Sequence, residues 1–256
     1  MRGEPMKRKY KVLIICLVLL VLLFLGGLFL LHTRTYQPLN ETLKETESTS
    51  QYTVKETNDA LIFLPLNNKG QQDTSVLFYQ GGLVEEKSYS TIAAKLATQG
   101  YPVYLVKHAL NLAVTDKNKA EAVIADEKIG DYVIGGHSLG GVMASRFAYA
   151  AATKQLKGVF LLASYPDENG RLDNLPLSVI SIIGSNDGVV DKEAYQDGRN
   201  YLPDSTLFYT IEGGNHAGFG DYGDQEGDNP GSISAEQQQE ETAKQLVEWL
   251  RTLETN

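Results

Sequence analysis

A serine set among closely spaced glycines is the clearest candidate for chemistry in the sequence. It lies in GHSLGG (136–141), after an apolar run typical of a strand and before an Ala-rich run typical of a helix. A turn this sharp presses Gly136 against Gly140, exposes the Ser138 hydroxyl and leaves the N–H of Leu139 free at the helix start. A plain glycine-rich turn or a phosphate cradle is the alternative, but the lysine of a P-loop is missing. The context predicts that Ser138 is a nucleophile and that Leu139 donates to an oxyanion.

A serine hydroxyl needs a base to take its proton and a carboxylate to orient that base. Downstream of Ser138 the only histidine is His216, in a glycine-rich loop beyond the last expected strand. Asp187 lies in the first loop after another apolar run, which gives the chain order Ser, Asp, His. Asp191, at the start of the following helix, and Asp173, in an earlier loop, are the alternative acids. We therefore predict a catalytic triad of Ser138, Asp187 and His216.

A second oxyanion donor is expected from the segment QGGLV (80–84). It follows the apolar run Val76–Tyr79, and its paired glycines let the backbone turn and point an N–H towards the serine. We assign this donor to the backbone of Leu83, with Gly82 as the near alternative. An ordinary strand-to-helix turn is the competing interpretation.

All these residues follow apolar runs in a regular alternation of strand-like and helix-like segments. Strand-like runs lie at 52–57, 60–64, 76–79, 103–106, 132–134, 159–162, 179–183 and 207–211, and helix-like stretches at 89–98, 117–126, 142–152, 192–201 and 235–253. Apolar strands covered by helices predict an α/β fold, with a mostly parallel sheet and helices on both faces, as one domain over residues 52–256. The working loops of such a sheet lie at the carboxyl ends of its strands, where the candidate residues fall.

An apolar run of twenty residues, 12–31, predicts a transmembrane helix, because a helix of this length spans about 30 Å. A cleaved signal peptide is the alternative, but the run exceeds a usual signal core and no A-x-A-like site follows. A basic tip at 1–11 precedes the run. We therefore expect a single-pass signal anchor in the cell membrane, with a cytoplasmic N-terminus and an extracellular domain. Residues 32–51 are rich in Thr, Ser and Glu and are expected to form a solvated tether.

The charge of the chain divides at the same place. The first eleven residues hold five of the 23 basic residues and one acid, so the remainder carries a charge of −13 within a total of −9. This acidic part lacks the basic face that nucleic-acid binding needs. The solitary cysteine, Cys16, lies in the apolar run, which excludes an intramolecular disulfide and any cysteine-based zinc cluster.

Two further segments shape the expected site. The loop after the base carries Asp221, Asp224, Glu226 and Asp228, but it lacks the glycine and closing glutamate of a calcium-binding EF-hand. We expect an acidic rim there, and no metal. The connection at 164–177 is too short for a helical cap domain. An open, shallow pocket follows, which favours small or exposed esters over long buried acyl chains.

With these residues placed, residues 52–253 resemble the α/β-hydrolase superfamily, and more narrowly bacterial membrane-anchored hydrolases described as dienelactone-hydrolase-like. The motifs that carry the resemblance are QGGLV (80–84), LNLA (110–113), GHSLGG (136–141), GSNDG (184–188) and GGNH (213–216), continuing into FGDYG (219–223). The resemblance implies the α/β-hydrolase fold and the triad roles of Ser138, Asp187 and His216. True dienelactone hydrolases use a cysteine where Ser138 stands, which argues against that activity.

The resulting expectation is a serine hydrolase, a carboxylesterase, that cleaves small-molecule esters through an acyl-enzyme on the outer face of the membrane, without a cofactor. Acyl transfer to a cell-surface acceptor uses the same groups and is an open alternative. A catalytically silent binding domain with the same fold is the alternative from a different class. The oligomeric state stays open at this stage.

Overall fold

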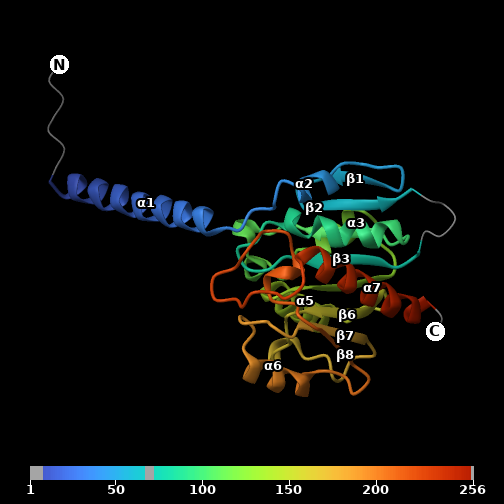
Figure 1. Cartoon of the computed structure of the whole chain (residues 1–256). Helices are drawn as coiled ribbons and strands as arrows, with labels where there is room; N and C mark the ends of the chain where they lie inside the picture. Colours follow the sequence, from blue (N-terminus) through green and yellow to red (C-terminus); the bar gives the residue numbers. More distant parts are fainter. Residues whose placement is uncertain (1–7, 67–71, 255–256) are drawn as a thin grey trace. The chain divides into compact units, whose positions relative to one another are not determined.

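Figure 1 shows the arrangement of helices and strands in a computed structural model of the chain, which describes residues 8–66 and 72–254. Arg2 and Lys7 of the predicted basic tip lie outside the described residues. The chain divides into two compact units, Met1–Thr35 and Tyr36–Asn256. Each unit is described by itself.

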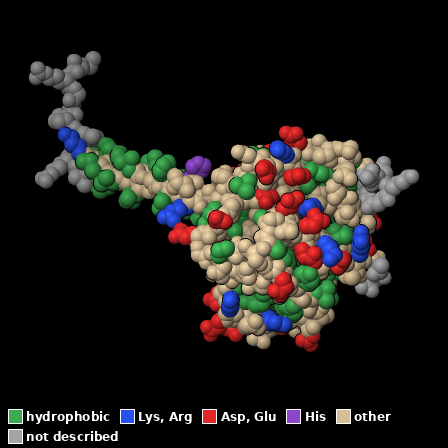
Figure 2. All heavy atoms as spheres, viewed as in Figure 1, with side chains coloured by type: hydrophobic (Ala, Val, Ile, Leu, Met, Phe, Trp, Pro, Cys, Tyr) green, Lys and Arg blue, Asp and Glu red, His purple; other side chains and the backbone are tan. Residues whose placement is uncertain are grey.

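The first unit contains the helix α1 (Arg8–Arg34), which includes the whole apolar run predicted to cross a membrane. Its apolar side chains are exposed on every side, and Leu23 and Phe29 are 73% and 70% exposed. Figure 2 shows hydrophobic side chains along its length, with Lys and Arg near its two ends. A helix that is apolar all round needs an apolar medium to cover it. Within the described residues, α1 is the one helix long and apolar enough to span a membrane.

The second unit is built on an eight-stranded sheet. In chain order the strands are β1 (Tyr52–Glu56), β2 (Ala60–Pro65), β3 (Ser75–Tyr79), β4 (Val103–Val106), β5 (Tyr132–His137), β6 (Leu156–Leu162), β7 (Ser178–Gly184) and β8 (Leu207–Ile211). Their order across the sheet is β1-β2-β4-β3-β5-β6-β7-β8. The pairs β1–β2 and β2–β4 are antiparallel, and every pair from β4 to β8 is parallel. The predicted mostly parallel sheet is therefore confirmed.

Helices cover both faces of this sheet, as predicted. They are α2 (Thr42–Glu45), α3 (Ser90–Thr98), α4 (Ala120–Asp126), α5 (Leu139–Ala151), α6 (Lys192–Gly198) and α7 (Ala235–Glu254). α3 and α7 pack together on one face, where Leu96 and Trp249 are buried in one core cluster (Figure 1). α4 and α5 cover the other face, where Val123 and Phe147 belong to a second cluster.

The central strand β3 explains why the sheet needs cover on both sides. All five of its residues are buried. Val76 and Phe78 point into the core under α3 and α7, whereas Leu77 and Tyr79 point into the core under α4 and α5. Alternate side chains of a strand lie on opposite faces, so a strand that is apolar throughout is stable only between two layers.

Two connections bear on the site. The described segment 163–177, between β6 and β7, contains a single short 3-10 turn (Glu168–Gly170), which agrees with the expectation of no cap domain. The expected tether at 32–51 differs from a solvated chain, because α1 continues to Arg34 and because Thr42 is buried within the second unit. Tyr36 forms a parallel bridge with Val84, and the compact unit begins at this residue.

Candidate active site

The candidate nucleophile stands at the sharp turn between β5 and α5. Ser138 is half-buried and has φ 52° and ψ −124°, a conformation that side-chain-bearing residues rarely adopt and that marks strain at functional sites. A Cβ on Gly136 or on Gly140 would overlap the carbonyl oxygen of Tyr79. The turn therefore requires glycine on both sides of the serine, as predicted. The main obstacle is the backbone of β3, and the crowding of Gly136 against Gly140 adds to it.

The candidate acid and base form a buried pair. The Oδ2 of Asp187 lies 2.9 Å from the Nδ1 of His216, and the two side chains are 3% and 1% exposed. The other carboxylate oxygen of Asp187 accepts the N–H groups of Val189 and Val190, at 2.9 and 2.8 Å. Burial alone raises the pKa of Asp187, but the bonds to His216 and to these N–H groups outweigh it and hold the pKa below its ordinary value. Asp187 is therefore ionised and accepts the Nδ1 proton of His216.

This pairing sets the direction in which the base can act. With its proton on Nδ1, His216 presents the lone pair of Nε2, which is buried and has no hydrogen-bond partner among the described residues. The imidazole lies against His137, the residue that precedes Ser138, with ring centroids 4.5 Å apart. The structure thus brings His216 beside the turn that carries the serine.

The two alternative acids have other partners. Asp191 begins α6 and accepts the N–H groups of Glu193 and Ala194, each at 3.0 Å, which is the work of a helix N-cap. Asp173 forms an ion pair with Arg171. Of the three aspartates that the sequence offered, Asp187 is the one bonded to the histidine.

The structure argues against the backbone donor that was predicted at Leu83. The N–H of Leu83, to which the sequence assigned this role, donates to the carbonyl oxygen of Asn111 at 2.8 Å and is therefore already bonded. The near alternative, Gly82, lies against the first residue of α5, because a Cβ built on it would be 3.3 Å from the Cδ2 of Leu139. Among the described residues the N–H groups of Gly82 and Leu139 have no acceptor. Of the two backbone donors that the sequence offers in this segment, Gly82 is therefore the one whose N–H stays available.

A buried tyrosine joins the two glycine-rich turns, and sequence reasoning missed it. The Tyr89 hydroxyl accepts the N–H of Gly81 at 3.0 Å and lies 2.9 Å from the Nδ1 of His137. Burial, and then the neighbouring His216, lowers the pKa of His137 well below its ordinary value, so this imidazole is neutral. Tyr89 donates to its Nδ1 and thereby links residues 80–84, the candidate oxyanion loop, to residues 136–141, the candidate nucleophile turn.

A second missed residue is Asp228, which the sequence placed in an acidic rim. One of its oxygens accepts the N–H of Gly188, next to Asp187, and the other accepts the N–H of Ala217, next to His216, both at 2.9 Å. A single carboxylate therefore connects the loop of the acid to the loop of the base. The sequence shows that Asp228 follows the base by twelve residues. Residue type alone does not reveal that its carboxylate accepts backbone N–H groups from both loops.

Another acid of this loop is also engaged. Asp221 accepts hydrogen bonds from the Thr91 hydroxyl at 2.6 Å and from the Gln239 side-chain amide at 2.8 Å. In residues 8–66 and 72–254, no group of three or more His, Cys, Asp or Glu side chains is arranged to hold a metal.

A third buried histidine, His108, contacts the first residue of the segment 80–84. His108 packs edge-on against Tyr79, and its Nδ1 lies 2.9 Å from the side-chain amide of Gln80, which also donates to the carbonyl oxygen of Val106 at 2.8 Å. Burial lowers the pKa of His108 to about 4. The residue is therefore neutral and structural at ordinary pH.

Solved structures with a similar fold are numerous. A predicted CIB-like hydrolase from Thermoplasma acidophilum is 16% identical, with a TM-score of 0.55 over 79% of this chain and 98% of that one. The esterase domain of a Rhodothermus marinus protein is 17% identical, with a TM-score of 0.56 over 79% and 98%. A carboxyl esterase from the fungus Tuber melanosporum is 13% identical, with a TM-score of 0.51 over 73% and 83%. At these identities the likeness shows a shared fold.

Sequence comparison identifies the family. No curated protein matches this chain. The family model described as the alpha/beta hydrolase family matches residues 75–240, more than half of the chain, and this span contains Ser138, Asp187 and His216. The chain belongs to the alpha/beta hydrolase family.

Proposed function

We propose that the protein is a serine hydrolase that cleaves carboxylic esters through an acyl-enzyme. The observation that carries the proposal is the buried pair of Asp187 and His216, which lies against the strained turn that holds Ser138. The esterases among the similar solved structures support an ester as the substrate class.

In the proposed reaction the Oγ of Ser138 attacks the ester carbonyl while the Nε2 of His216 takes its proton. The N–H groups of Gly82 and Leu139 bind the oxyanion that forms. His216 then gives the proton to the departing alcohol, which leaves an acyl-serine. Water attacks this acyl group and its proton goes to His216. Collapse of the second oxyanion releases the acid, and His216 returns the proton to the Oγ of Ser138. The ionised Asp187 stabilises the imidazolium that appears in each step.

A fluorophosphonate probe tests this proposal, because it labels only a serine that a base has activated. We expect the full chain in detergent to be labelled and to hydrolyse p-nitrophenyl acetate. Ser138→Ala abolishes both, whereas Ser205→Ala, which removes an exposed serine, changes neither. A folded wild-type chain that fails to label would favour a silent binding domain. Transfer of the acyl group to an added alcohol faster than to water would favour the acyltransferase alternative.

We also propose that α1 is an uncleaved signal anchor that leaves the second unit outside the cell. The support is the length and all-round apolar surface of α1, together with the basic residues that precede its apolar run. Protease treatment of intact cells should remove the second unit from the full-length band, and full protection would contradict the outward orientation.

A further inference from the structure

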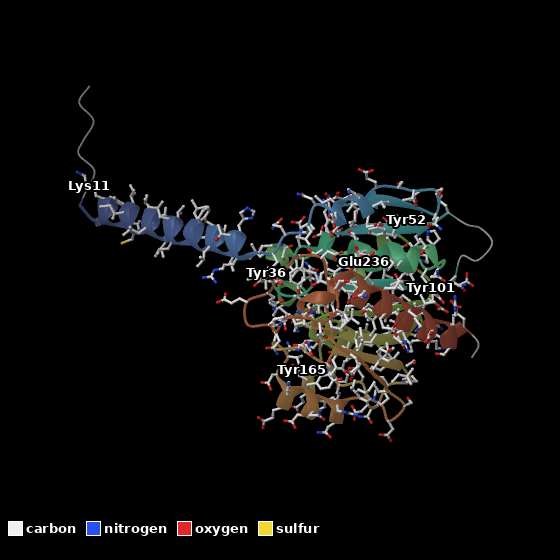
Figure 3. The ribbon with its side chains drawn as sticks, viewed as in Figure 1. Lys11, Tyr36, Tyr52, Tyr101, Tyr165 and Glu236 are labelled. Atoms are coloured by element: carbon white, nitrogen blue, oxygen red, sulfur yellow. The ribbon has the colours of Figure 1, made fainter. Side chains whose placement is uncertain are left out.

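The chain that leaves α1 joins the second unit beside the candidate active site. The N–H of Tyr36 donates to the carbonyl oxygen of Leu83 at 2.7 Å, and its own carbonyl oxygen accepts the N–H of Glu85 at 3.0 Å. In Figure 3, Tyr36 lies at the opposite end of the second unit from Tyr101, which precedes β4. The end marked by Tyr36 carries the loops that follow the parallel strands.

The same segment also contacts the loop that follows the base. The N–H of Leu39 donates to the carbonyl oxygen of Asp221 at 2.8 Å. The Tyr36 ring packs against Tyr222 with centroids 5.3 Å apart, and its hydroxyl accepts the N–H of Glu226 at 3.1 Å. Residues 36–39 therefore lie across both the oxyanion loop and the base loop.

The length of the connecting chain limits how far this end can lie from a membrane that holds α1. The apolar run ends at Leu31, three helical steps lead to Arg34, and two more steps reach Tyr36. Those steps span at most about 12 Å. The headgroup layer on each side of a bilayer is about 5–7 Å thick. Tyr36, and with it the oxyanion loop, must therefore lie within the headgroups or a few ångströms above them.

Exposed apolar side chains gather along the same loops. Leu39 is 48% exposed, and on the neighbouring loop Leu110 and Val114 are 45% and 55% exposed. Leu110 has φ 58°, an unfavourable conformation for a leucine. Asn111, the next residue, accepts the N–H of Leu83, so Leu110 lies beside the oxyanion loop. Apolar side chains that are exposed close to the point where a chain leaves the membrane are suited to insertion among lipid headgroups.

We propose that this end of the second unit rests on the outer leaflet of the membrane that holds α1, and that the substrate is an acyl ester lodged in that leaflet. The inference rests on the proposed function and names its substrate class. The ester group of such an amphiphile lies at headgroup level, where the oxyanion loop is held. Its acyl chain stays in the bilayer, so hydrolysis requires no acyl-binding tunnel in the protein.

Fluorescence quenching tests the docking without reference to activity. The full chain carrying Cys16→Ser is labelled with nitrobenzoxadiazole at Leu110→Cys or, as the matched control, at Lys154→Cys. Lys154 is exposed and lies just before the amino end of β6, at the end of the sheet opposite to the loops that follow the parallel strands. In phosphatidylcholine vesicles, lipids with a TEMPO nitroxide on the choline headgroup should quench the label at 110 several-fold more than the label at 154. Equal quenching at the two positions would overturn the docking.

A rigid spacer tests the substrate class. Four EAAAK repeats between Arg34 and Thr35 continue α1 by about 30 Å and lift the second unit off the bilayer. Hydrolysis of p-nitrophenyl palmitate embedded in vesicles should fall roughly tenfold or more, because the effective concentration of the ester at the site is lost. Hydrolysis of soluble p-nitrophenyl acetate should stay unchanged, and the same spacer after residue 256 should affect neither rate.

The outcomes distinguish failure of this inference from failure of the proposed ester hydrolysis. If the spacer leaves the rate on embedded palmitate unchanged while acetate is cleaved normally, the enzyme reaches the embedded ester without being held at the leaflet, and the inference is overturned. If the unmodified chain cleaves neither ester, the proposed function fails, and the substrate class fails with it. The quenching measurement decides the docking in either case.

Discussion

Asp228 accepts the backbone N–H of Ala217 at 2.9 Å, and with its other carboxylate oxygen it accepts the N–H of Gly188 at the same distance. The loop of the candidate base and the loop of the candidate acid are thus bound to one side chain. An ionised carboxylate that accepts N–H groups forms stronger hydrogen bonds than a neutral amide does. The geometry of the acid–base pair therefore depends on a residue that touches neither member of it.

Replacing this carboxylate should weaken both loops. In Asp228→Asn, one side-chain atom that accepted an N–H becomes a donor facing a donor, so we expect kcat to fall roughly tenfold and the free energy of unfolding to fall by about 1–3 kcal/mol. Asp224→Asn, at an exposed position of the same loop, is the matched control. Ester hydrolysis and urea unfolding measure the two effects. Unchanged kcat in the folded variant would show that Asp228 does not position the pair.

The candidate acid can be distinguished from its neighbour by the same substitution at two positions. Asp187→Asn removes the negative charge that orients His216, and we expect kcat to fall roughly 10³- to 10⁴-fold. Asp191→Asn keeps a good helix N-cap and should leave the rate near that of the wild type. Equal losses in the two variants would contradict the assignment.

Tyr89→Phe should leave two buried polar groups without a partner, the N–H of Gly81 and the Nδ1 of His137. We expect the free energy of unfolding to fall by about 1–3 kcal/mol. We also expect slower fluorophosphonate labelling, because the oxyanion loop loses its tie to the nucleophile turn. Tyr149→Phe, at an exposed position of α5, serves as control. A variant with reduced stability but unchanged labelling would limit Tyr89 to a structural role.

The nucleophile turn should not tolerate a methyl group. Gly140→Ala places a Cβ on the carbonyl oxygens of Tyr79 and Gln80, so we expect a loss of at least about 2 kcal/mol in unfolding free energy, together with loss of labelling. Gly130→Ala has open space around its Cβ and should change stability by less than about 0.5 kcal/mol. Thermal unfolding of the two variants makes the comparison, and equal stability would contradict the crowding of the turn.

Buried neutral histidines should make the fold sensitive to mild acid. The folded state keeps His108 neutral down to a pKa of about 4, whereas the unfolded chain protonates it near its ordinary value of 6.5. Its contribution to stability is therefore complete above pH 6.5 and is lost as the pH falls towards 4, by about 3 kcal/mol in full. His108→Asn keeps a polar partner for Gln80 and cannot titrate. The fall in unfolding free energy between pH 7 and pH 4.5 should be smaller in this variant, and an equal fall would contradict the prediction.

Much of the fold follows from patterns that residue types carry directly. The apolar runs predicted all eight strands. The pattern is clearest in central strands such as β3, because a strand buried on both faces needs apolar side chains at every position. The aspartate bonded to His216 was also predicted, because one aspartate follows a strand end and its rival Asp191 stands where a helix begins.

The features that were not predicted depend on backbone hydrogen bonds, and the identity of a side chain says little about these bonds. The sequence placed an oxyanion donor at Leu83 because it could not show that Asn111 already accepts that N–H. It assigned residues 32–51 to a solvated tether because the bridge of Tyr36 to Val84 needs no apolar periodicity. Asp228 was missed for the same reason, since its partners are N–H groups.

The bridge between Tyr36 and Val84 also determines where the second unit can be cut from α1 without a change in its loops. A cut directly after Arg34 frees a unit that keeps the bridge, whereas a cut at 47–51 removes it and leaves the carbonyl oxygen of Leu83 and the N–H of Glu85 to water. Two soluble forms that differ by fewer than twenty residues at their new N-terminus would therefore differ in the order of the oxyanion loop. A fragment that lacks α1 keeps the loop after β3 as it is in the full chain only if its first residues still include Tyr36.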